Sequence, residues 1–160
     1  MPAAPPLIEP ARFEGAPVLF GPERIQEFNP QRFEFALLSG ILHYADDDDL
    51  CVGFHDVRAD AFWTRGHIPG RPIFPGVLIV EAVAQLCTCF WGLRKKPSRE
   101  NFYGFGWVDE VRFRGTVVPP CRLLLVASVL QMRTAAARWE TQAFVGGERV
   151  FEGKIFGALV

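Results

Sequence analysis

The sequence has few of the features that are typical of proteins that bind nucleic acid, span a membrane or fold in an oxidising compartment. Its net charge is only −1, from 17 basic and 18 acidic residues, so it lacks the broad basic field that attracts a phosphate backbone. It contains no run of 18 uncharged apolar residues, the length that a membrane span requires. Prolines interrupt the N-terminus where a signal peptide would need an unbroken apolar stretch. We therefore expect a cytoplasmic protein that binds neither membrane nor nucleic acid.

Metal-binding patterns are also missing. The four cysteines, Cys51, Cys87, Cys89 and Cys121, do not have the paired spacing of zinc sites, and Cys87 and Cys89 would project from different sides of a helix. They are expected to be buried free thiols. The run of aspartates at 46–49 is predicted to be a charged turn, because four consecutive side chains do not converge easily on one cation. No metal site is expected.

The length and composition indicate one domain. The chain has 160 residues, 49% of them hydrophobic, which is enough for one sizeable core, and no shift in composition marks a second. Seven of the 13 prolines lie within the first 30 residues. Because proline lacks an N–H donor, residues 1–24 are expected to form an extended surface segment without helix or central strand. Residues 25–160 are expected to form a single domain.

Hydrophobic patterning predicts one enclosed helix and six strands. A strand over 33–45 and its partner over 50–57 flank the aspartate turn. A loop rich in proline and glycine follows at 58–76, and then an apolar helix from Gly76 to Gly92 with almost no polar face. Four further strands are predicted to form an antiparallel meander, over residues 102–113, 122–132, 138–145 and 149–158. In the third of these strands, Arg138, Glu140 and Gln142 alternate with less polar residues and are predicted to face solvent. This is an α+β fold in which a curved sheet wraps a helix.

One carboxylate interrupts the apolar helix. An ionised carboxylate costs several kcal/mol to bury unless it is paired or used, which draws attention to Glu81. Gln85, four residues later on the same face, can hydrogen-bond and orient the carboxyl group. Burial raises the pKa of such a group and suits it to donate a proton near neutral pH. A structural ion pair between Glu81 and an arginine is the alternative reading.

Two further features precede Glu81. The N–H groups of Gly76, Val77 and Leu78 open the helix without partners inside it, so they can hold an oxygen that gains negative charge. Gly76 would also let a substrate approach the backbone closely. His67 lies just before, in a loop stiffened by prolines, and can act as a base. His43 and His55 lie in predicted strands without such a setting and are read as structural.

The residues that carry this chemistry resemble a known signature. The stretch HIPGRPIFPGVLIVEAVAQ, residues 67–85, closely resembles that of the 3-hydroxyacyl-[acyl-carrier-protein] dehydratases, which have the hot-dog fold. VDEVRF at 108–113 and VVP at 117–119 resemble the later strand and turn of that family. The resemblance implies that His67 abstracts the C2 proton and that Glu81 protonates the departing 3-hydroxyl group. It also implies that Gly76 and Val77 hold the thioester oxygen.

The resemblance also implies partners and assembly. The substrate would be a (3R)-3-hydroxyacyl thioester on acyl carrier protein or coenzyme A, converted to the trans-2-enoyl thioester without a cofactor. Members are homodimers, often assembled into hexamers, whose active sites take the histidine and the acid from different protomers. An acidic carrier protein could meet basic residues after the helix, namely Arg94, Lys95, Lys96 and Arg99, or other surface arginines.

Departures from the family pattern leave alternatives open. Ile68 stands where an aromatic residue is usual, and Gln31 stands where the family has histidine. Ser39 lies where an aspartate is often found, and Pro120 and Cys121 replace Gly-Asp. These differences fit a paralogue in another acyl or polyketide pathway as well as the fatty-acid enzyme. The other readings are a hot-dog thioesterase and a non-catalytic module that binds acyl chains or carrier proteins.

Overall fold

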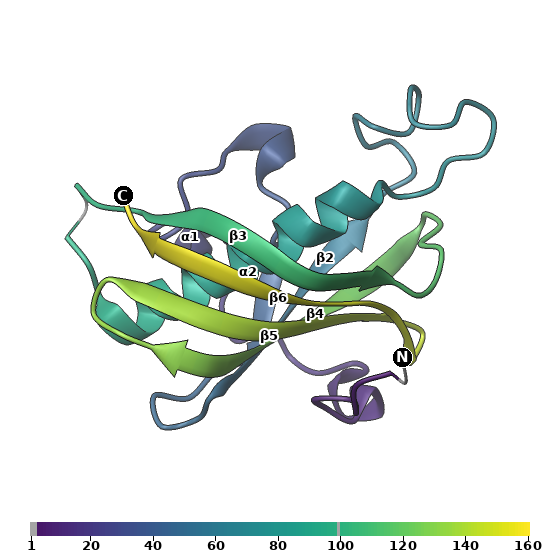
Figure 1. The fold of residues 1–160 in the computed structure, drawn as a ribbon. Helices are drawn as coiled ribbons and strands as arrows, with labels where there is room; N and C mark the ends of the chain where they lie inside the picture. The colour runs from purple at the N-terminus through teal and green to yellow at the C-terminus, as the bar shows by residue number, and fades with distance from the viewer. Residues whose placement is uncertain (1–2, 99) are drawn as a thin grey trace.

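A six-stranded antiparallel sheet curves around one long helix in a computed structural model of the chain (Figure 1), which describes residues 3–98 and 100–160. The α+β prediction is therefore confirmed. The strands are β1 Gly40–His43, β2 Leu50–Val57, β3 Tyr103–Phe113, β4 Cys121–Met132, β5 Ala136–Val145 and β6 Glu148–Leu159. The helices are α1 Pro22–Ile25 and α2 Gly76–Lys95, with 3₁₀ turns η1 Pro10–Phe13 and η2 Phe33–Phe35.

Helix α2 forms the centre of the core. Its most apolar stretch has a mean hydropathy of 1.7, enough to cross a membrane by length and composition, but 67% of that stretch is buried inside the molecule. The helix continues past the predicted end at Gly92 and stops at Lys96, which has a left-handed backbone and donates its N–H to the Gly92 carbonyl. Gly92 serves packing, because a Cβ atom there would lie 2.5 Å from the Phe28 ring.

The strand order is β1-β2-β4-β5-β6-β3. Strands β4, β5 and β6 form the predicted meander, but the prediction that β3 pairs with β4 is wrong. Strand β4 already pairs with β2 on one edge and with β5 on the other. The chain therefore carries β3 to the far side of the sheet, where it pairs with β6 and forms an edge.

The first predicted strand is much shorter than expected. Residues 33–35 form the turn η2, and β1 begins only at Gly40. The side-chain oxygen of Gln85 accepts hydrogen bonds from the Leu37 and Leu38 amides, at 2.9 and 3.1 Å. These main-chain donors are taken by a side chain from α2, so this segment does not extend the ladder of the sheet.

A second apolar layer covers the convex face of the sheet. Leu125 and Ala127 belong to the main core with α2, whereas Val126 belongs to a separate cluster. Because successive strand residues point to opposite faces, this cluster lies on the side away from α2. Residues 3–16, here called the N-terminal strap, supply part of it. The prolines did not exclude helix: η1 and α1 begin at Pro10 and Pro22, where proline at the first turn is compatible with a helix.

Candidate active site

The loop over residues 58–75 holds His67 and projects beyond the sheet and helix, as the teal loop in Figure 1 shows. Two buried aromatic side chains fix its base: Trp63 and Phe74 are 5% and 2% exposed, and their rings meet edge-on with centroids 5.3 Å apart. The Phe74 N–H donates to the Val117 carbonyl at 2.8 Å. The His67 N–H donates to the Trp63 carbonyl, also at 2.8 Å. The loop is therefore anchored at its base on both sides of His67.

One hydrogen bond selects the tautomer of the His67 ring. Its Nδ1 lies 2.7 Å from the Ile73 carbonyl oxygen. A carbonyl oxygen can only accept, so Nδ1 carries the proton and Nε2 of the neutral ring keeps a free lone pair. The ring is thus prepared to accept a proton at Nε2. The next residue, Ile68, has a left-handed backbone with a φ of +57°, and its side chain is 46% exposed.

The start of α2 offers two amides. Within the described residues, no acceptor receives the N–H groups of Gly76 or Val77. Leu78, the third amide predicted for this group, is different, because it donates to the Pro75 carbonyl at 2.9 Å. The Val77 side chain is 73% exposed, so the helix start faces outward. Both free amides lie at the positive end of the helix dipole.

The structure shows a packing role for Gly76 that the sequence did not reveal. A Cβ atom at this position would lie 2.9 Å from the ring of Phe113, at the end of β3. That is closer than carbon atoms pack without displacement. The aromatic ring therefore occupies the space beside the Gly76 backbone, and a side chain at this position would require the half-exposed ring to move.

Glu81 lies in the second turn of α2 and is half-buried. Gln85 Nε2 donates to Glu81 Oε1 at 2.8 Å, as the i, i+4 spacing predicted. Burial raises the pKa of the Glu81 carboxyl above its ordinary value, and the hydrogen bond from Gln85 partly offsets that rise. Within the described residues, no arginine or lysine pairs with Glu81. The described residues therefore do not supply the partner that the alternative of a structural ion pair requires.

The Gln85 side chain is fully buried and connects helix α2 with residues 35–38 through hydrogen bonds, a site called here the Gln85 junction. Its oxygen accepts from Leu37 and Leu38, and its amide nitrogen donates to the Phe35 carbonyl at 2.8 Å as well as to Glu81. Both sides of the amide are saturated, so it cannot flip without losing bonds. The sequence predicted the contact with Glu81 but not these main-chain contacts, since no local spacing connects residues 35–38 with the helix.

Two departures from the family pattern lie together behind this junction. Gln31 and Ser39 line one cavity of about 180 Å³, along with Asn29 and Gln85. Asn29 is 3% exposed and donates from Nδ2 to the Gln85 carbonyl at 2.9 Å. Sequence reasoning noted each departure separately and could not place them side by side.

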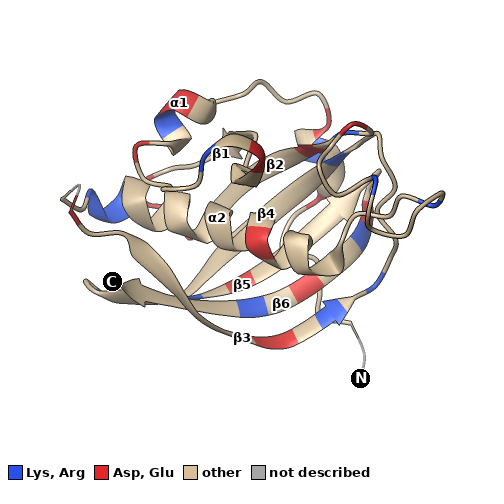
Figure 2. Ribbon diagram, turned by 90° about the horizontal axis from the view of Figure 1, so that it is seen from above, with Lys and Arg blue, Asp and Glu red and all other residues tan. Residues whose placement is uncertain are grey.

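The structure brings together some of the predicted site residues and not others. Glu81 and Gln85 are in contact, and Gly76 and Val77 lie about one turn before Glu81 on α2. No hydrogen bond or ion pair joins His67 with Glu81 in the part of the chain that the structure describes. Figure 2 shows α2 with one acidic band in its N-terminal half and basic residues at its C-terminal end.

The other predicted groups occupy distinct places. Arg94 is partly committed elsewhere, since it donates to the Asp48 carbonyl at 2.6 Å and lies over the Phe90 ring. Lys95 and Lys96 are exposed at the end of α2 opposite to Gly76, and Arg99 lies outside the described residues. His43 Nε2 contacts Asp48 at 2.7 Å.

The thiols and acids form no metal site in the described part of the chain. Four free cysteines are present; Cys51, Cys87 and Cys89 are buried and Cys121 only half-buried. Burial raises the pKa of Cys89 to about 12. No group of three or more histidine, cysteine or acidic side chains in residues 3–98 and 100–160 could hold a metal ion.

Comparison with known proteins decides the family. Residues 29–154 match the FabA-like domain family. The 3-hydroxyacyl-[acyl-carrier-protein] dehydratase FabZ of Brucella abortus is 36% identical over 126 residues, covering 79% of this chain and 80% of that protein. The chain belongs to the FabA-like family.

Other similarities agree with this membership. The bifunctional enzyme LpxC/FabZ of Chlorobaculum tepidum is 32% identical over 145 residues, 91% of this chain but only 31% of that longer protein. The dehydratase heterocomplex ApeI:P from Xenorhabdus doucetiae has a TM-score of 0.72 at 15% identity, covering 85% of this chain and 90% of the other. Thioesterase PA1618 from Pseudomonas aeruginosa has a TM-score of 0.62 at 16% identity, covering 86% and 92%. At such low identity, both structures show a shared hot-dog fold alone.

Proposed function

We propose that this FabA-like protein is a (3R)-3-hydroxyacyl-thioester dehydratase that forms the trans-2-enoyl thioester reversibly. The observation that carries the proposal is the pairing of a half-buried, hydrogen-bonded Glu81 with two free amides one turn earlier on the same helix. The relatives named as FabZ dehydratases support the same reaction. No cofactor is required, because proton transfer and an anion hole suffice for eliminating water.

The proposed mechanism follows from the hydrogen bonds. Nε2 of His67 takes the C2 proton, since Nδ1 is occupied by the Ile73 carbonyl. The Gly76 and Val77 amides receive the thioester oxygen as it gains negative charge. Glu81 delivers a proton to the departing 3-hydroxyl group from Oε2, because Oε1 accepts from Gln85. Gln85 therefore acts as a positioning residue.

We propose that the active site is shared between the two protomers of a homodimer, which can assemble further into a hexamer. Three observations support this arrangement: the His67 loop projects outward, no hydrogen bond or ion pair joins His67 with Glu81 among the described residues, and β3 is an edge strand. Edge strands invite pairing with another copy. Several large apolar side chains of β3 are 40–53% exposed, namely Phe105, Trp107, Val108 and Phe113.

The substrate carrier is proposed to be acyl carrier protein, with coenzyme A as the alternative. Arg65 and Arg71 are exposed on the same loop as His67, so they are better placed than Lys95 and Lys96 to meet an acidic carrier. The acyl chain would pass along an apolar tunnel at the protomer interface. We also propose a cytoplasmic location, consistent with the one apolar helix being buried in the core.

The test replaces the proposed base. Purified enzyme given a crotonyl or 3-hydroxyacyl thioester should interconvert the two, as followed by enoyl absorbance. His67→Ala should lower the rate by about 10² to 10⁴, while His43→Ala, a histidine on β1, should leave it unchanged. Thiol release without a change in enoyl absorbance would indicate a thioesterase instead. Wild-type protein as inactive as His67→Ala with every carrier would overturn the catalytic proposal.

A further inference from the structure

The convex face of the sheet carries an apolar surface that the N-terminal strap covers. A sheet with a helix on one face commonly leaves the other face to water. Here five large side chains on that other face are buried, namely Leu42, Val52, Phe54, Val126 and Phe144. The strap supplies the residues that pack on them: Leu7, Ile8 and Phe13. Without the strap, this cluster would face solvent.

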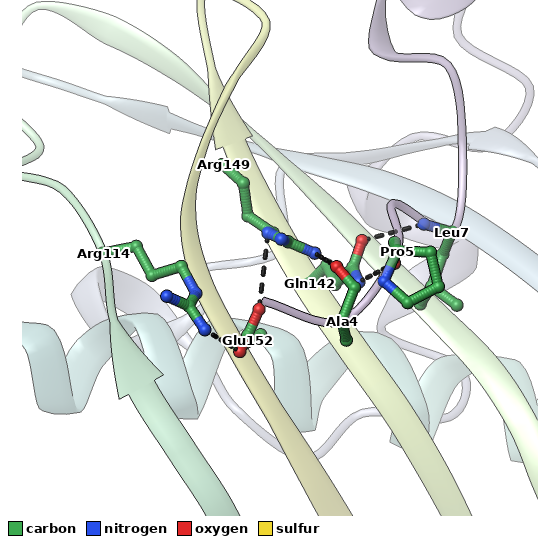
Figure 3. Close-up of polar contacts among 7 residues, drawn as sticks. All are labelled: Ala4, Pro5, Leu7, Arg114, Gln142, Arg149 and Glu152. Carbon is green, nitrogen blue, oxygen red and sulfur yellow. Dashed lines mark hydrogen bonds and ion pairs between the residues drawn. The ribbon is translucent and has the colours of Figure 1, made fainter. Parts of the chain in front are cut away.

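One buried glutamine recognises the main chain of the strap. Gln142 on β5 is fully buried, although its position in the strand pattern predicted a wet face. Its Oε1 accepts from the Leu7 N–H at 2.9 Å, and its Nε2 donates to the Pro5 carbonyl at 2.9 Å (Figure 3). These bonds tie the strap to the middle of the sheet.

An arginine on the neighbouring strand holds the end of the strap. Arg149 Nη1 donates to the Ala4 carbonyl at 2.6 Å. Its Nε lies 3.4 Å from Glu152 Oε2, and the other oxygen of Glu152 accepts from Arg114 (Figure 3). The side chains of Arg149 and Glu152 are only 14% and 8% exposed. The group that contacts Ala4 is therefore itself held in place.

The strap has a composition suited to covering a face without extending the sheet. Pro5 and Pro6 restrict the backbone, so less conformational entropy is lost when the strap docks. They also lack the N–H groups that would pair with another strand. The strap precedes residues 29–154, the part of the chain that matches the FabA-like domain family.

We propose that the strap is a built-in cover that keeps the convex face from binding the same face of a second copy of the chain. An exposed apolar patch of this kind promotes association. Two copies of the chain related by a two-fold axis can pack the same patch against each other, so no other protein is needed to bury it. The strap therefore limits self-association to other surfaces, such as the β3 edge.

The test displaces the strap without altering the sheet. Ile8 is 8% exposed, so Ile8→Asp places a charge against the apolar cluster and should release the strap. Ala11→Asp adds the same charge at an exposed position of the strap and is the matched control. In the full-length protein, Ile8→Asp should speed hydrogen exchange at the Leu7 amide by at least about tenfold. Sedimentation should show that its assembly mass roughly doubles relative to wild type.

Each result decides the proposal. A second variant, Gln142→Leu, removes both hydrogen bonds to the strap while keeping an apolar surface. Gln131→Leu, at an exposed position of β4, controls for added hydrophobicity. Faster exchange at Leu7 together with larger assemblies, in either variant but neither control, supports the cover. Faster exchange with an unchanged assembly overturns it, as does an unchanged exchange rate in both variants. Far-UV circular dichroism, measured alongside, identifies any variant that has lost its fold.

Discussion

Two buried glutamines on opposite faces of the sheet use the same chemistry for different ends. Gln85 on α2 and Gln142 on β5 are both fully buried. Each binds main-chain groups of a segment that lies within the first 40 residues and belongs to no strand: residues 35–38 for Gln85, and the strap for Gln142. A buried amide supplies a donor and an acceptor at one place, which is what an irregular backbone needs.

The difference lies in what else each glutamine contacts. Gln85 also donates to Glu81, whose carboxyl is expected to carry a proton to substrate. The Gln142 side chain hydrogen-bonds no acidic group among the described residues, and we expect that the strap it binds can leave the sheet and return to water. A buried polar side chain thus indicates an irregular backbone in both places, and it indicates chemistry only where a second polar side chain with a shifted pKa accompanies it.

The largest effect is expected at Gln85. Gln85→Leu leaves the Leu37 and Leu38 amides without acceptors inside the core, and the half-buried Phe35 carbonyl loses its donor. Unsatisfied buried groups cost about 1–3 kcal/mol each, so we expect a loss of about 3–5 kcal/mol in the free energy of unfolding. Urea denaturation measures the loss. Turnover should fall as well, because Glu81 loses its hydrogen-bond partner. A loss below that of Gln142→Leu would reverse the comparison.

The next effect concerns the helix start. Gly76→Ala should lower kcat roughly 100-fold, because the new methyl group meets the Phe113 ring and displaces the amides of the proposed anion hole. KM should change little. If the clash is the cause, adding Phe113→Leu should restore much of the lost rate. A double variant no more active than Gly76→Ala, with Phe113→Leu alone active, would show that the ring is not responsible.

Local patterns predicted much of this fold. The apolar run after Pro75 predicted α2, and β2 was predicted at its observed bounds. The i, i+4 spacing placed Gln85 against Glu81. These features depend on neighbours within a few residues of one another, which is why sequence alone could indicate them.

Contacts between distant segments were not predictable. The meander prediction failed for β3 because β2, far earlier in the chain, occupies an edge of β4. The strand over 33–45 failed because a side chain of α2 takes its amides. Gln142 looked exposed in the strand alternation, since nothing local showed that a proline-rich segment more than 130 residues away covers it.

Gln142→Leu should have a smaller effect than Gln85→Leu. The strap can detach and expose its Leu7 N–H and Pro5 carbonyl to water, so the penalty is limited to the docking energy of the strap. We expect a loss of about 1–2 kcal/mol in the free energy of unfolding. Turnover per site should stay unchanged, because the strap lies on the face away from α2. A loss as large as that of Gln85→Leu would mean that the strap is part of the core.

The smallest effect is a pH dependence on the convex face. The hydrogen bond from Arg114, with the charges of Arg114, Arg149 and Arg112, lowers the pKa of Glu152 below its ordinary value of 4.5. A carboxyl group with a lowered folded-state pKa adds stability above its unfolded pKa, and that stability is lost as the pH falls through the folded value. Wild type should therefore lose more stability than Glu152→Gln between about pH 7 and about pH 3, as measured by urea midpoints. Glu148→Gln, an exposed carboxyl on the same strand, should follow wild type. Equal slopes for wild type and Glu152→Gln would mean that Arg149 is held without this carboxylate, and the strap would then depend on Gln142 and apolar packing alone.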